Sequence, residues 1–82
     1  MTTIECIMHG SLEDYLPDSL KSNHSLVEFE STPSVNDILA HYNIDEELLQ
    51  FVLADGCYIE LEHWHEPSKG KQFQFWPRIS GG

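Results

Sequence analysis

The segment from Ser34 to Asn43 constrains the fold more than any other part of the chain, because it carries the clearest pattern of an amphipathic helix. Its apolar residues recur at positions i, i+3, i+4 and i+7 and therefore share one helical face: Val35, Ile38, Leu39 and Tyr42. Ser34 is a favourable N-cap, and Asp37 stands at the third helical position, as in a capping box. Asn43 predicts a left-handed C-terminal residue. A helix with one apolar face needs another layer to cover it.

Strand patterns precede this helix. Apolar residues alternate over positions 4–8, which predicts a first strand, and residues 26–30 predict a second. Between the two, Ser11 and Asp14 have the spacing of a capping box and predict the start of a short helix. Pro17 should end that helix, because the residue before a proline avoids the helical region.

Strand patterns also follow the helix. The apolar run over residues 51–54 is typical of a central strand that is covered on both faces. Asp55-Gly56 is a strong hairpin signal, so residues 57–61 should form the returning strand. A polar loop then leads to residues 72–76, whose aromatic and amide side chains predict the last strand.

These patterns together predict an α+β roll, in which one main helix covers one face of a mixed sheet of about five strands. A chain of 82 residues has room for one domain with one modest core. We expect residues 1–77 to form this domain and residues 78–82 to form a flexible tail. Pro77 should stop the sheet, and the glycine end offers little packing to offset the entropy of ordering it.

The charge of the chain restricts its partners. Fourteen acidic residues against four basic ones give a formal net charge of -10. Nucleic acids and anionic membranes need lysine and arginine to neutralise their phosphates, so neither is an expected partner. A protein with a basic docking face is an expected partner, because opposite charges speed the encounter. The acidic surface can also serve only to keep the protein soluble. The sequence shows neither a run of about 20 apolar residues nor a secretory signal, so we expect a cytoplasmic protein.

The two cysteines do not predict a reactive site. Cys6 and Cys57 both lie in apolar, strand-like segments, so we expect buried, unpaired thiols. Neither stands near a cluster of basic residues that would lower its pKa.

The segment around His63 and His65 offers imidazoles at alternate positions, which is compatible with a metal site. The nearby glutamates follow no recognised ligand spacing, so we interpret the pair as surface histidines and expect no metal. Trp76 should pack in the core or at the edge of the sheet, and the sequence leaves Trp64 open between packing and an exposed docking patch.

The C-terminal third resembles the ThiS/MoaD family, the small ubiquitin-like sulfur carriers of thiamine and molybdopterin biosynthesis. The family's ending has an aromatic-Pro-x-Val-Ser-Gly-Gly pattern, and the chain has Trp76-Pro77-Arg78-Ile79-Ser80-Gly81-Gly82. Residues 34–39 resemble the start of the family's helix, and residues 53–56 resemble its usual turn. Lys71, which stands where the family usually has aspartate, and the segment 60–68 depart from the pattern. The resemblance implies a β-grasp fold.

The resemblance also implies a function. An E1-like adenylating enzyme would use ATP to activate the carboxylate of Gly82, a sulfur-donor enzyme would convert it to a thiocarboxylate, and a synthase would accept the sulfur. Gly81 and Gly82 lack side chains that would block a narrow channel in such a partner. The residues that would contact the partner lie just before them: Pro77, Arg78, Ile79 and Ser80. The chain would be a carrier and co-substrate, a role that includes the non-catalytic small subunit of a synthase, and it would hold no permanent cofactor.

Two alternatives from other classes stay open at the level of sequence. A protein modifier would be joined through Gly82 to lysines of its targets, and its activation also starts with adenylation. A non-covalent β-grasp binding module would use the surface of its sheet, and its tail would be incidental. The sequence does not indicate which pathway receives the sulfur. The product could be molybdopterin, thiazole, an amino acid or another metabolite.

Overall fold

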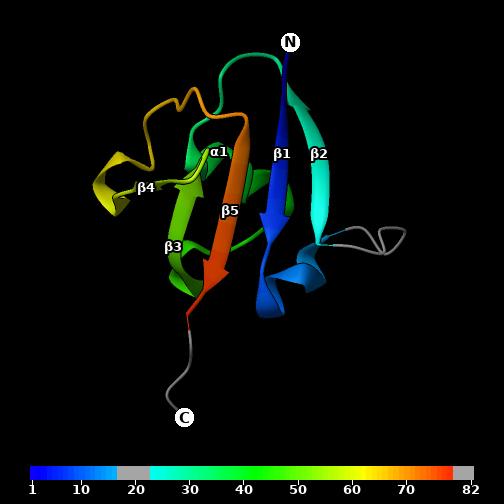
Figure 1. The fold of residues 1–82 in the computed structure, drawn as a ribbon, viewed down its shortest axis with the longest axis vertical. Coiled ribbons are helices and arrows are strands. Elements are labelled where there is room, and N and C mark those ends of the chain that lie inside the picture. Colours follow the sequence, from blue (N-terminus) through cyan, green and yellow to red (C-terminus); the bar gives the residue numbers. More distant parts are fainter. Residues whose placement is uncertain (17–22, 79–82) are drawn as a thin grey trace.

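A computed structural model describes residues 1–16 and 23–78, and these residues form one sheet, one α-helix and three short 3₁₀ helices (Figure 1). In chain order the elements are β1 (Thr2–Met8), η1 (Gly10–Tyr15), β2 (His24–Phe29), α1 (Val35–Tyr42), η2 (Glu46–Leu48), β3 (Leu49–Ala54), β4 (Cys57–Ile59), η3 (Leu61–His63) and β5 (Gln72–Pro77). No helix of the described ranges is long and apolar enough to cross a membrane.

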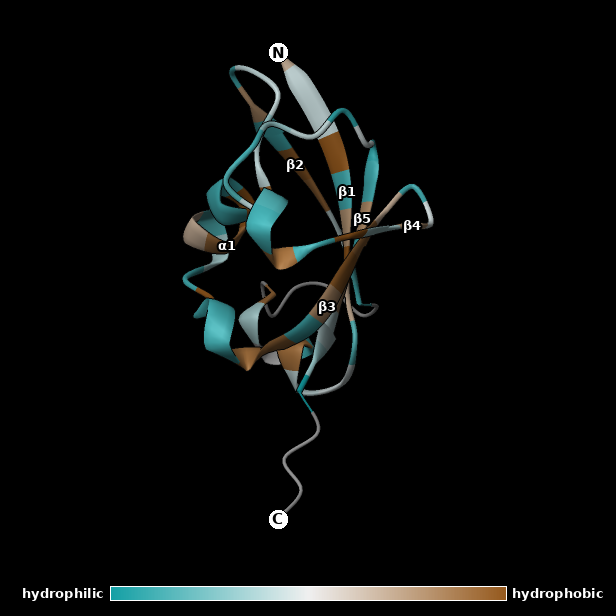
Figure 2. Ribbon diagram, turned by 90° about the vertical axis from the view of Figure 1, so that its left-hand side faces the viewer, coloured by the Kyte–Doolittle hydropathy of each residue, from teal (hydrophilic) through white to brown (hydrophobic). Residues whose placement is uncertain are grey.

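The five strands lie in the order β2-β1-β5-β3-β4. Strands β1 and β5 run parallel, and the other neighbouring pairs are antiparallel. Helix α1 packs against one face of this sheet and leaves the other face open (Figure 2). The mixed sheet with a single main helix confirms the predicted α+β roll, and this strand order is that of a β-grasp fold.

The local signals at α1 are confirmed. The Oγ of Ser34 accepts a hydrogen bond from the backbone N–H of Asp37 at 3.0 Å, and the Asp37 carboxylate accepts one from the Ser34 N–H at 2.9 Å. Asn43 is left-handed, with φ of 60°. The predicted face is buried: Val35, Ile38, Leu39 and Tyr42. Capping and periodicity therefore fix both the ends of the helix and its orientation on the sheet.

The core lies between α1 and the central strand β5. Phe73 and Phe75 are fully buried there, beside Cys6 and Met8 of the parallel strand β1. Burial raises the pKa of the Cys6 thiol to about 12, so this thiol stays protonated as expected. The hydroxyl of Tyr42 donates a hydrogen bond to Ser25 Oγ at 2.9 Å, which satisfies two polar side chains at the edge of the core.

The prediction that residues 51–54 form a central strand covered on both faces is wrong. The central strand is β5, and β3 lies between β5 and β4. Val52 and Ala54 are buried, whereas Phe51 and Leu53 are partly exposed, because α1 covers only one face of the sheet. Alternate residues of this apolar run therefore face the core, and the residues between them face the open side of the sheet.

Three further predictions need correction. Ser11 does not cap a helix, because η1 already starts at Gly10, and its N-cap residue, His9, makes no side-chain capping bond. Strand β4 ends at Ile59, short of the predicted end at residue 61. Cys57 is exposed rather than buried, because β4 is a short strand at the edge of the sheet. The predicted helix stop at Pro17 lies outside the described residues.

The segment between β4 and β5 is fastened to the start of α1. Trp64 is buried at 4% exposure and donates its indole N–H to the Ile59 carbonyl at 3.0 Å, which decides the open question in favour of packing. The Trp64 carbonyl accepts a hydrogen bond from the Asn36 N–H, and the Pro33 carbonyl accepts one from the Ser68 N–H, both at 3.0 Å. The unusual segment 60–68 thus closes over the edge of the core.

Candidate functional site

The candidate site lies where β5 ends, at Pro77 and Arg78. Pro77 is the last residue of β5 and pairs with Leu49 of β3. Gly10, with φ of +57°, packs against the other side of this end, where a Cβ atom would lie 3.0 Å from Pro77 Cγ. Positive φ and this close approach both favour glycine at position 10. The end of β5 is therefore held from two sides.

Arg78 is bound to the domain by two hydrogen bonds. Its backbone N–H donates to the Leu48 carbonyl at 2.9 Å, and its Nε–H donates to the Leu49 carbonyl at 3.1 Å. The sequence predicts that the flexible tail begins at Arg78. In the structure, Arg78 itself still contacts the domain through these two hydrogen bonds. Ile79, Ser80, Gly81 and Gly82 lie outside the described residues, so the structure locates only Pro77 and Arg78 of the predicted site residues.

An aromatic row crosses the open face of the sheet next to this end. We define it as His9, Trp76, Phe51 and Tyr58. The His9 ring stacks on Trp76 with centroids 3.7 Å apart, Trp76 stacks on Phe51 at 5.5 Å, and Phe51 lies 6.4 Å from Tyr58. His9 Nε2 and Gln74 Oε1 form a hydrogen bond of 3.1 Å, which holds the imidazole over the indole. The prediction that Trp76 packs in the core or at the edge of the sheet is therefore wrong, because Trp76 lies on the open face of the central strand β5.

The indole of Trp76 carries an unsatisfied donor. Its Nε1 is shielded from solvent and has no hydrogen-bond partner among the described residues. An unpaired buried donor costs free energy, so the Trp76 indole destabilises the domain locally. The aromatic row is thus a partly exposed apolar surface, which is common at protein interfaces.

A second surface feature adjoins Arg78 on the side of β4. We call it the acidic hollow and define it by Glu46, Glu47, Tyr58, Leu61, Trp64 and Arg78, which line it together with the neighbouring part of β3. Its volume is about 120 Å³. Tyr58 and Leu61 are 62% and 60% exposed, so the hollow has apolar walls beside its two carboxylates. The hollow and the aromatic row share Tyr58.

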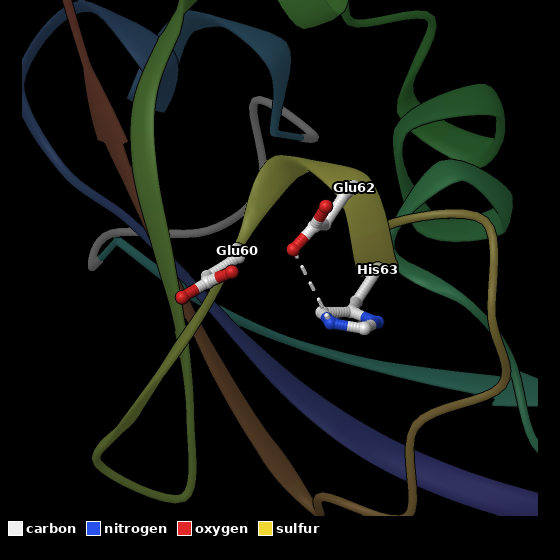
Figure 3. Close-up of side chains that lie close together, drawn as sticks. All are labelled: Glu60, Glu62 and His63. Atoms are coloured by element: carbon white, nitrogen blue, oxygen red, sulfur yellow. Dashed lines mark ion pairs between the residues drawn. The ribbon is translucent and has the colours of Figure 1, made fainter.

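The segment after β4 brings three possible metal ligands together. Glu60, Glu62 and His63 each offer a ligand atom, and these atoms lie within 4.8 Å of one another (Figure 3). All three side chains are exposed, and His65 is not part of the group. Exposed acidic groups commonly gather without an ion, and nothing else at this place points to one.

His63 is instead engaged with a neighbouring carboxylate. Its Nδ1 lies 2.9 Å from Glu66 Oε2, and its Nε2 lies 3.7 Å from Glu62 Oε1. The hydrogen bond to Glu66 is the main reason that the pKa of His63 is raised, and the same bond lowers the pKa of Glu66. Both groups are exposed, so the pair belongs to the solvated surface.

Sequence reasoning missed the surroundings of the site. Neither His9 and Phe51 of the aromatic row nor Glu46 and Glu47 of the acidic hollow were expected to lie near the end of β5. The sequence held no signal for the aromatic row, because the pairing of Phe51 with Trp76 depends on the register of β3 against β5.

Comparison with known proteins supports the fold and goes no further. The structure is similar to the crystal structure of SAMP1 from Haloferax volcanii, with a TM-score of 0.61 and 14% sequence identity. The match covers 98% of this chain and 99% of that chain. No protein-family model matches the sequence, and no curated protein matches it. At this identity the likeness establishes the ubiquitin-like β-grasp fold alone.

Proposed function

We propose that the chain is a sulfur carrier whose reacting group is the carboxylate of Gly82. An E1-like enzyme would join this carboxylate to AMP with release of pyrophosphate from ATP, and hydrosulfide supplied by a sulfur-donor enzyme would then displace AMP and leave the thiocarboxylate. The resulting thiocarboxylate would pass its sulfur to a synthase of molybdopterin, thiamine or a related pathway. The chain would supply the acyl group and its partners the catalytic groups, so it would act as a co-substrate.

The observation that carries this proposal is the position of Arg78. Its two hydrogen bonds to Leu48 and Leu49 are the last contacts described between the chain and the domain, and the sequence after them is Ile-Ser-Gly-Gly. Four residues span at most about 14 Å when fully extended. A partner that acts on Gly82 must therefore approach the domain closely, and it would meet the aromatic row and the acidic hollow beside Arg78. These surfaces are suitable for such contact.

The test is conversion of the C-terminal oxygen to sulfur. The purified chain is incubated with ATP, a cognate adenylating enzyme and a sulfur donor, and its intact mass should change by one exchange of oxygen for sulfur. The proposal requires Gly82 to carry a free carboxylate, which the intact mass of the starting protein also checks. A chain without Gly82 should not react, and its free energy of unfolding should be unchanged.

Gly81→Val is a second variant, and Ser80→Ala is its matched control. A branched side chain restricts the backbone and fills a narrow channel, so Gly81→Val should react much more slowly. Ser80→Ala only removes a hydroxyl, so it should react at a rate close to that of the unaltered chain. Equal rates for the two variants would mean that no narrow channel receives the tail.

The alternatives give different products. Attachment of Gly82 to target lysines, with no thiocarboxylate at any stage, would replace the proposal by a protein modifier. A chain that is never adenylated and that binds its target equally well without Gly81 and Gly82 would be a non-covalent binding module.

A further inference from the structure

A second hollow borders Arg78, and Arg78 is the one lining residue that it shares with the acidic hollow. We call it the apolar hollow and define it by its lining residues: Ser11, Leu12, Tyr15, Leu48, Pro77 and Arg78. Helix η1, which supplies the first three, packs beside the end of β5 (Figure 1). The hollow has a volume of about 360 Å³, and none of its lining side chains is acidic. Tyr15 and Leu48 are 39% and 41% exposed, so it presents apolar surface that the described residues leave uncovered.

The course of the chain at the end of β5 decides which tail residue reaches this hollow. The N–H of Arg78 is bonded to the Leu48 carbonyl, so Arg78 continues the path of β5 beside the neighbouring segment. Side chains alternate between the two sides of an extended chain, so an extended continuation places residue 79 on the side of Pro77. Pro77 lines the apolar hollow, and residue 79 is only one Cα step of about 3.8 Å beyond Arg78. The tail residue that follows Arg78 is therefore directed over the hollow.

The identity of that residue fits the hollow. Ile79 is the only large apolar residue among the four that follow Arg78, and the others are serine and glycine. Its side chain carries no charge, so the guanidinium of Arg78 at the rim does not repel it. A residue of the same chain is also held at a high effective concentration, so it occupies the hollow ahead of a free protein of equal intrinsic affinity.

We propose that the side chain of Ile79 docks in the apolar hollow and holds the tail of the free chain against the domain as far as this residue. Only Ser80, Gly81 and Gly82 would then extend freely, over at most about 11 Å. The gain from burying one side chain is of the same order as the entropy cost of ordering its residue, so the contact is reversible. A partner that draws the tail into a deep channel must first release Ile79. This consequence rests on the proposed function, whereas the contact itself does not.

The contact is tested by NMR without any enzyme or ATP. The full chain is labelled with ¹³C at its isoleucine δ1 methyl groups, and Ile79→Val identifies the Ile79 signal by its disappearance. This methyl group should show nuclear Overhauser effects to the ring protons of Tyr15 and to the methyl protons of Leu48. A signal at the shift of an isoleucine in an unfolded peptide, without these effects, would overturn the inference.

Variants of two exposed leucines locate the contact. Leu48→Ser removes an apolar wall of the hollow, so the Ile79 methyl signal should move to the unfolded-peptide shift and lose its effect to Tyr15. Leu61→Ser is the matched control, because Leu61 is also exposed and lies near Arg78 but lines only the acidic hollow, so the Ile79 signal should not move. The amide spectrum of each variant checks that the domain is folded. Tyr15→Ser removes a different wall and should repeat the result of Leu48→Ser. An Ile79 signal that moves equally in Leu48→Ser and Leu61→Ser would place the contact elsewhere.

A kinetic measurement then tests the consequence for activation. A docked tail reduces the fraction of chains that are ready to enter the partner, so Leu48→Ser should lower the KM for this chain in adenylation several-fold and leave kcat unchanged. An unchanged or raised KM would overturn the consequence, and Leu61→Ser is again the control. Because the NMR measurement needs no activation, the two proposals fail separately. A chain that forms a thiocarboxylate while Ile79 makes no contact refutes the docking alone, and the reverse result refutes the proposed function alone.

Discussion

Replacement of Leu39 by alanine tests the packing on which the fold depends. Leu39 lies on the buried face of α1 and is 3% exposed. Three buried carbons at about 0.8 kcal/mol each give about 2.4 kcal/mol of lost burial. The cavity adds to this, so we expect a loss of about 3 kcal/mol, within the range of roughly 2–5 kcal/mol for buried leucines. A domain of 82 residues has roughly 4–12 kcal/mol of stability, so the variant should fold but be clearly weakened.

Urea denaturation followed by tryptophan fluorescence measures the loss. The midpoint should fall while the slope with urea stays the same, since the surface exposed on unfolding hardly changes. Leu26→Ala is the matched control, because Leu26 on β2 is 74% exposed and its loss should cost no more than about 0.5 kcal/mol. If Leu39→Ala costs no more than Leu26→Ala, the packing of α1 on the sheet is wrong.

Three further predictions follow from single residues. Ser34→Ala removes the N-cap of α1 and should cost about 1 kcal/mol in the same denaturation assay. By NMR titration the pKa of His63 should lie above 6.5, and Glu66→Gln should lower it. Because the pKa of His63 is raised and that of Glu66 is lowered, their pairing should stabilise the fold mainly between pH 4.5 and 6.5. This stabilisation should be lost as the pH rises through the pKa of His63, and also as the pH falls through the pKa of Glu66. Iodoacetamide should label Cys57 in the native protein and Cys6 only after unfolding, and the intact mass of the protein gives the number of labels. Two labels on the native chain would contradict the burial of Cys6.

The sequence was most informative where structure is decided locally. The capping box of Ser34 and Asp37 joins residues three apart, and the buried face of α1 follows from the helical period alone. The turn at Asp55-Gly56 is equally local, with φ of 50° and 82° at its two residues. Such features depend little on the rest of the chain, so they could be predicted without knowing the topology.

The sequence was less informative where structure depends on distant partners. Exposure of Cys57 depends on β4 being an edge strand, which follows from the strand order and not from the residues around Cys57. Asp55 illustrates the same dependence, because its carboxylate accepts hydrogen bonds from the N–H groups of Lys71 and Gln72 at 3.0 and 2.9 Å. The turn before β5, where Lys71 departs from the family pattern, is thus held by a residue sixteen positions away.

The aromatic row depends on one irregularity that no periodic pattern can reveal. Leu49 pairs with Pro77 and Phe51 with Trp76, so Gln50 is an extra residue and β3 is bulged there. Strict alternation would place Leu49 and Phe51 on one face, but the bulge lets Leu49 enter the core while Phe51 joins Trp76 on the open face. The carbonyls of Leu48 and Leu49, which precede the bulge, are the two that anchor Arg78. The bulge therefore places both the aromatic row and the anchor of the tail, and a regular β3 would lose one or the other.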